Sequence, residues 1–156
     1  THIIQIEKDQ IKAPNLVNLL SNDKILKLFH FGRFDIAILF STFGVITSPV
    51  YCTKIASKIA RTYTDRHGLK NLLSEILDVD ISKQQQSSDW GAKHLSEAQI
   101  EYAATDVLYL HALREKLNEM LTRENRSELA NECFKFLPSR AVLDIKGWND
   151  IDIFEH

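Results

Sequence analysis

A chain of 156 residues is long enough for one domain with a hydrophobic core and hardly long enough for two. With 44% hydrophobic and 26% charged residues, its composition is ordinary for a globular protein. A net charge of −2 argues against a generally basic surface, so any site for a polyanion must be local or assisted by a metal ion. No apolar run reaches the length of a membrane-spanning helix.

The first third of the sequence predicts strands that alternate with helices. Apolar runs favour the strands, Pro14 suits the first turn of a helix, and Gly44 suits a helix end. The expected elements are strands over 1–6 and 25–30, helices over 15–20 and 34–43, and a short extended segment around Pro49.

The remainder predicts helices, interrupted by a polar, glutamine-rich loop over 82–94. The expected helices cover 54–64, 69–77, about 96–121 and 125–137. Pro138 is expected to end the last helix, and the apolar residues of the tail 141–156 are expected to pack against the body. Early alternation followed by helices alone favours an α/β domain with a helical flank.

The helix that begins after Ser96 has two notable faces. Ser96 and Gln99 have the spacing of a capping box, which marks the start of the helix. Ile100 and Val107 belong to one apolar face, whereas Tyr102 and Asp106 lie one turn apart on another. The helix is therefore expected to be covered on two sides, with a carboxylate inside one contact. A bound metal ion or a Lys or Arg partner would each stabilise that carboxylate.

Asp35 is a second candidate because it follows a predicted strand, at the first turn of a helix. Alone, this position is equally explained by a favourable interaction with the helix dipole. Together, Asp35, Asp106 and the neighbouring Tyr102 suit a carboxylate site for Mg²⁺ or Mn²⁺. Paired ions of this kind promote phosphodiester cleavage.

Several segments, in this order, resemble motifs of the DEDD-type 3′–5′ exonucleases, and of ribonuclease D in particular. His30–Asp35 resembles the second exonuclease motif, and Tyr102–Asp106 resembles the third motif in its Tyr-x-x-x-Asp form. Gly68–Leu73, Gln86–Trp90 and Leu95–Gln99 resemble runs found between these motifs in ribonuclease D. The resemblance spans roughly residues 1–121, and the tail 147–154 is similar to the ending of short bacterial members.

The resemblance implies a ribonuclease-H-like 3′–5′ exonuclease fold with a mixed β-sheet flanked by helices. It implies hydrolysis from RNA 3′ ends, of the tRNA-precursor type, with two Mg²⁺ or Mn²⁺ ions and release of nucleoside 5′-monophosphates. Asp106 would ligate the ion that binds the attacking water, Asp35 would hold the second ion, and Tyr102 would orient the water. A cytoplasmic location and no membrane or protein partner are expected.

One part of the family pattern is absent. The first motif, Asp-x-Glu, supplies two of four carboxylates, and nothing before Asp35 matches it. We therefore expect a single exonuclease domain over 1–156 that lacks its N-terminal strands, with 122–156 as a helical extension and packed tail. Such a chain is expected to bind metal weakly and to turn over poorly.

Basic and aromatic residues supply candidate substrate contacts. Lys54, Lys58 and Arg61 are spaced to share a helix face, which either is simply solvated or contacts phosphates. Phe31 and Phe34 either stack on a 3′-terminal base or belong to the core, and His30 precedes them in the motif. Two alternatives remain: a DNA exonuclease of the same fold, and a non-catalytic RNA-binding module that lacks the first motif.

Overall fold

The computed structural model describes residues 1–6, 12–81, 85 and 87–155. Strands β1 (Lys27–Phe29) and β2 (Val50–Cys52) form a two-stranded parallel sheet in which Leu28 lies opposite Tyr51. The helices are α1 (Pro14–Ser21), α2 (Arg33–Phe43), α3 (Thr53–Ala60), α4 (Leu69–Leu77), α5 (Glu97–Leu108), α6 (Leu110–Arg123), α7 (Ser127–Leu143) and the π-helical turn η1 (Asp144–Trp148).

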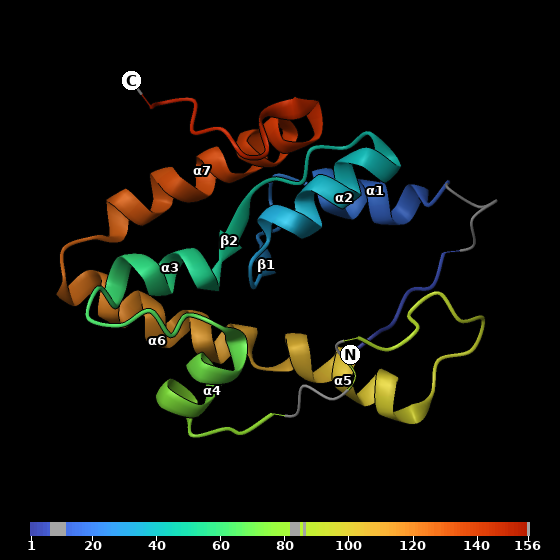
Figure 1. Ribbon diagram of the computed structural model, residues 1–156, viewed down its shortest axis with the longest axis horizontal. Helices are drawn as coiled ribbons and strands as arrows, with labels where there is room; N and C mark the ends of the chain where they lie inside the picture. The colour runs from blue at the N-terminus through green and yellow to red at the C-terminus, as the bar shows by residue number, and fades with distance from the viewer. Residues whose placement is uncertain (7–11, 82–84, 86, 156) are drawn as a thin grey trace.

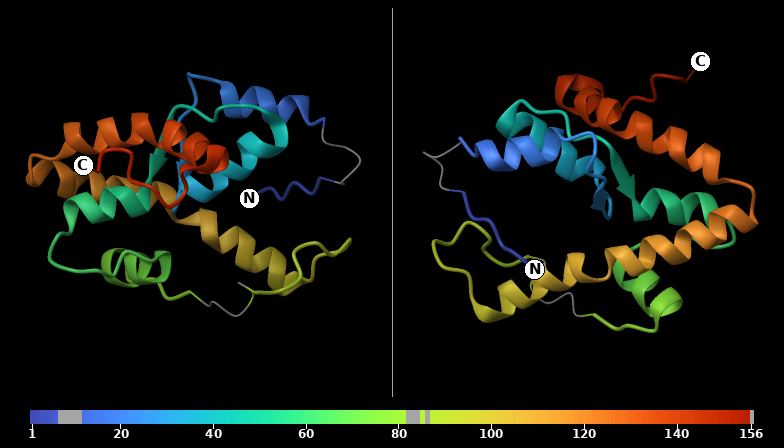
Figure 2. Two further views of the ribbon diagram at one scale, coloured as in Figure 1. Left: turned by 45° about the horizontal axis from the view of Figure 1, so that its top comes forward. Right: turned by 180° about the vertical axis from the view of Figure 1, so that it is seen from behind.

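The hydrophobic core lies where the sheet meets α3, α6 and α7. On α6, Leu113, Leu117 and Leu121 recur every four residues and form one fully buried stripe. Each leucine of this kind stabilises the fold by about 2 kcal/mol through its burial. Helix α3 packs on α6, and α2 packs on α7. The candidate aspartates lie on α2 and α5, and Figures 1 and 2 show α5 below α2.

The α/β class is confirmed, with helices around a small parallel sheet. Helix α2 ends at Gly44, which adopts a left-handed conformation, and α4 has the predicted bounds. In the described part of the chain only the parallel pair forms, so the antiparallel strands of the expected mixed sheet are not seen there. Across the same residues, no helix has the length and apolarity needed to cross a bilayer.

The prediction of a strand over Thr1–Ile6 is wrong, because this segment is irregular and exposed. An extended apolar segment becomes a strand only when a neighbour accepts its backbone hydrogen bonds. Among the described residues none pairs with it. Alternation in the sequence cannot supply that neighbour.

Two predicted helix boundaries also differ. The long helix divides at Tyr109 (φ −98°, ψ 0°), where α5 ends and α6 begins. Pro138 lies inside α7 and does not end it. A proline inside a helix costs about 3 kcal/mol. The α7 face that continues through Phe134, Leu137 and Ala141 is buried, and its packing offsets that cost.

Candidate active site

Asp35 lies in the first turn of α2, immediately after the β1–α2 connection. Asp35 is exposed, and partial desolvation of its carboxyl group raises the pKa above the usual range. A backbone hydrogen bond opposes this rise. A cation near Asp35 would therefore stabilise the ionised form.

His30 is held in one orientation by Thr53, the first residue of α3. The Thr53 hydroxyl donates to the carbonyl oxygen of Phe29 (3.2 Å) and so accepts from Nδ1 of His30 (2.9 Å). Burial, assisted by the charge of Lys54, lowers the pKa of His30 to about 4. The imidazole is therefore neutral at pH 7, and its Nε2 is a hydrogen-bond acceptor.

Phe31 presents an exposed aromatic ring beside this turn. Its φ of 62° is in the left-handed region, which is costly for a bulky residue. The Lys54 ammonium lies 3.8 Å from the centroid of the Phe31 ring, and the Phe34 ring lies 6.1 Å away at a tilt. At Gly32 a Cβ atom would lie 2.6 Å from Cβ of Phe29, so only glycine fits there.

An apolar cleft of about 310 Å³ opens next to these rings. It lies between the start of α2 and the η1 region, and it is lined by Phe31, Arg33, Phe34, Ala37, Ile38, Asp144, Ile145, Asn149 and Asp150. Its volume is at the lower end of the range found for small-molecule sites. The cleft can therefore accept one planar group beside Phe31 and Phe34.

Tyr102 and Asp106 form a second group on α5. Burial raises the pKa of the Asp106 carboxyl, and a hydrogen bond with Tyr102 opposes that rise. Burial first, and then the Asp106 charge, raise the pKa of Tyr102. The Trp90 ring packs 5.9 Å from the Tyr102 ring. Tyr102 is thus a protonated phenol at neutral pH, which can form hydrogen bonds but is a poor base.

The start of α5 explains why two of the motif runs occur together. The capping box is present: the Ser96 backbone N–H donates to Oε1 of Gln99 (2.9 Å), and the Gln99 N–H donates to Oγ of Ser96 (3.3 Å). The Gln99 amide also donates to Oγ of Ser88 (3.1 Å) and to the carbonyl of Asp89 (2.9 Å). Gln99 therefore ties the loop before α5 to the helix, whereas Gln86 lies outside the described residues.

The described residues do not contain a complete metal site. Nowhere among them do three or more His, Cys, Asp or Glu side chains lie close enough to share an ion. The expected double cover of α5 is also wrong, because Ile100 and Val107 are 45% and 48% exposed.

Arg61 does not share the exposed face expected of it. It follows the last residue of α3 and is only 3% exposed, because it forms an ion pair with Glu75 and donates to the carbonyl oxygen of Arg66 (3.2 Å). The helix ends one turn earlier than predicted, which turns this side chain inward. Lys58 is exposed, and Lys54 lies on Phe31, so these two lysines remain as candidate phosphate contacts.

Sequence reasoning missed Thr53, whose hydroxyl selects the tautomer of His30. The only signal for it in the sequence was a threonine directly after an apolar strand.

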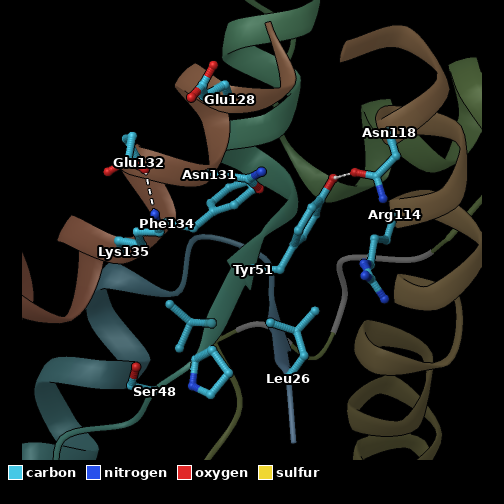
Figure 3. Close-up of a pocket in the computed structure, with 12 residues that line it drawn as sticks. Leu26, Ser48, Tyr51, Arg114, Asn118, Glu128, Asn131, Glu132, Phe134 and Lys135 are labelled. Carbon is cyan, nitrogen blue, oxygen red and sulfur yellow. Dashed lines mark hydrogen bonds and ion pairs between the residues drawn. The ribbon is translucent and has the colours of Figure 1, made fainter. Parts of the chain in front are cut away.

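A larger cavity of about 450 Å³ lies between β2, α6 and α7, where the Tyr51 hydroxyl donates to Asn118 (3.0 Å) (Figure 3). None of the predicted site residues lines this cavity.

Comparison with known proteins shows which family the chain matches. Residues 1–122 match the family model described as 3′-5′ exonuclease. Ribonuclease D of Acidiphilium cryptum is 35% identical over 130 residues, which are 83% of this chain and 33% of that protein. The chain thus spans about a third of the length of this curated relative.

Several solved structures are also similar to this chain. Brucella melitensis NrnC is 62% identical, with a TM-score of 0.94, over 97% of this chain and 74% of that chain. NrnC structures are also known with bound Mg²⁺ and bound to pGG. Escherichia coli RNase D is 27% identical, with a TM-score of 0.75, over 87% of this chain and 37% of that chain. The chain therefore belongs to the 3′–5′ exonuclease family and has its fold.

Proposed function

We propose that this protein is a metal-dependent 3′–5′ exoribonuclease that removes nucleotides from the 3′ ends of short RNA. The observation that carries the proposal is the 62% identity to NrnC over 97% of this chain. One NrnC structure is bound to pGG. The tRNA-precursor substrate is expected from the resemblance to ribonuclease D, and a ribonuclease D relative is only 35% identical to this chain. The higher identity favours a short 5′-phosphorylated RNA as the substrate.

The cleft beside Phe31 and Phe34 is the proposed site for the base at the scissile end. Phe31 offers an exposed ring, and Phe34 lines the same cleft. Stacking of a base on such a ring contributes about 1–3 kcal/mol without selecting a sequence. Lys54 and Lys58, one turn apart on α3, would contact phosphates, and the acceptor Nε2 of His30 would accept from a ribose hydroxyl.

A divalent cation suits the donors that are present. Asp35 and Asp106 are hard oxygen ligands, and partial desolvation raises the pKa of both carboxyl groups, so a cation would stabilise their ionised forms. The ion would supply positive charge to the phosphodiester as it is cleaved. We propose Mg²⁺ or Mn²⁺ and two ions in the complete site. Asp35 and Asp106 alone are fewer ligands than such a site needs.

The test uses the whole product of the natural gene and its Asp106→Asn variant. Each is incubated with pGG or with 5′-labelled single-stranded RNA in Mg²⁺ or Mn²⁺. We expect nucleoside 5′-monophosphate from pGG and a ladder that shortens by one nucleotide at a time from RNA. Both products should be lost in the variant and in EDTA, while the variant remains folded by circular dichroism.

Three outcomes would contradict the proposal. Faster digestion of a DNA strand of the same sequence would favour the DNA exonuclease. RNA binding without any cleavage would favour the non-catalytic module. Cleavage by Asp106→Asn at the wild-type rate would remove Asp106 from the active site.

A further inference from the structure

The segment after α7 is attached to the first turn of α2 by a bidentate ion pair. Asp144, the first residue of η1, accepts from Nε of Arg33 at 2.5 Å and from a terminal guanidinium nitrogen at 2.7 Å. These residues are 111 positions apart in the sequence. The Asp144 side chain is 14% exposed and the Arg33 side chain is 38% exposed, so water screens the pair from the arginine side only. The two parallel hydrogen bonds tie the tail to α2 in one geometry.

A second arginine completes the connection. Arg140, one turn before Asp144 on α7, forms an ion pair with Oδ1 of Asp144 (3.0 Å), the same oxygen that accepts from the terminal guanidinium nitrogen of Arg33. It also donates to the carbonyl oxygens of Trp148 (2.7 Å), Asn149 (3.1 Å) and Ile151 (3.1 Å). Arg33 donates to the Asn149 carbonyl as well, at 2.8 Å. The chain departs from helical geometry at Gly147 (φ 104°), which leaves backbone carbonyls without helical partners. The two guanidinium groups bind these carbonyls.

The first turn of α2 has little local support. Gly32 at its N-cap has no side chain to accept from the free N–H groups, and Phe31 before it has a left-handed backbone. The Phe34 N–H reaches the Phe31 carbonyl only at 3.4 Å, whereas the Ile36 N–H donates to Gly32 at 2.9 Å. Among the described residues, no ion pair or side-chain hydrogen bond holds Asp35.

We infer that Asp144 is a positioning residue that, through Arg33, holds the first turn of α2 and therefore the carboxylate of Asp35. The inference rests on the proposed exonuclease function and gives the tail a role in it. Asp35 is two residues from Arg33 on the same helical turn, so loss of the tie displaces the carboxylate. A displacement of about 1 Å at a reacting group lowers rates by as much as a hundredfold.

The test compares Asp144→Asn with Glu132→Gln. The control also neutralises an acidic residue of the α7–η1 region, but it removes an exposed ion pair with Lys135. For the whole gene product with pGG and Mg²⁺, we expect Asp144→Asn to lower kcat about tenfold and to raise KM by a smaller factor. KM changes less because Phe31 and Lys54 lie outside the displaced turn, although Phe34 and the cleft wall at Asp144 shift with it. Asp144→Glu, which keeps a carboxylate, should recover most of kcat.

Amide hydrogen exchange supplies a readout that does not depend on activity. The Ile36 amide should exchange about tenfold faster in Asp144→Asn and at the wild-type rate in Glu132→Gln. Unchanged kcat and unchanged Ile36 exchange in a folded Asp144→Asn protein would overturn the inference. So would a loss of kcat that the control shares. If Asp144→Asn does not fold, Arg33→Lys, which keeps the charge without the two parallel hydrogen bonds, is measured in its place.

Failure of the proposed function is distinguishable from failure of this inference. A wild-type protein that does not cleave pGG or RNA refutes the exonuclease proposal. In that protein the exchange rate of Ile36 still shows whether Asp144 holds the turn.

Discussion

Replacement of Glu75 by Gln tests whether Arg61 is a structural residue or an RNA contact. The guanidinium of Arg61 is buried, and Glu75 is its only carboxylate partner among the described residues. Arg61 would keep the Arg66 carbonyl (3.2 Å) and the Ser57 hydroxyl (3.4 Å). Gln retains the shape of Glu and an acceptor oxygen, so the change removes mainly the charge.

The expected loss follows from the burial of the pair. Removal of one partner of a fully buried pair costs about 3–5 kcal/mol. Glu75 is 31% exposed, and its second partner, Arg66, is largely exposed, so water compensates part of the loss. We expect the free energy of unfolding to fall by about 2 kcal/mol, which lowers Tm by roughly 4–8 °C in a chain of this size.

The assay is thermal unfolding followed by circular dichroism, together with RNA affinity at several salt concentrations. Lys58→Ala is the matched control, because Lys58 is an exposed cation on the same helix. We expect it to leave Tm within about 1 °C and to reduce the salt dependence of RNA binding by about one phosphate contact. An unchanged Tm with tighter RNA binding in Glu75→Gln would refute the structural assignment of Arg61.

Three further predictions concern the candidate site. Phe31→Gly should raise the free energy of unfolding, measured by urea unfolding, by about 1 kcal/mol, because glycine tolerates φ of 62°. The same change should weaken pGG binding, measured by calorimetry, about tenfold, because it removes the ring on which a base would stack. Loss of stability in this variant would show that the ring belongs to the core. Tyr102→Phe should lower kcat by about 10²-fold with little change in RNA affinity, and equal losses in both would indicate a packing role. Because the pKa of His30 is lowered to about 4 from 6.5, its neutral form contributes stability above pH 6.5 that is lost as the pH falls toward 4. His30→Gln should therefore flatten the pH dependence of Tm in this window, and an unchanged slope would contradict the burial of the imidazole.

The features that the sequence predicted correctly depend on near neighbours. The capping box at Ser96 and Gln99, the left-handed Gly44 and the bounds of α4 each involve residues a few positions apart. The ordered motifs from His30 to Asp106 predicted the family, which the comparisons confirm. The roles assigned to Asp35, Tyr102 and Asp106 stay predictions until the variants are measured.

The remaining features depend on contacts between distant segments, and the tertiary structure alone decided them. Arg61 reads as an exposed cation on a helix, but the earlier end of α3 places it against Glu75. Pro138 reads as a helix end, but the buried face of α7 outweighs its cost. Arg33 and Asp144 carry no mutual signal over 111 positions, yet they form a bidentate pair. Local patterns determine where helices begin and which residues share a face, whereas burial and charge pairing depend on which surfaces meet after folding.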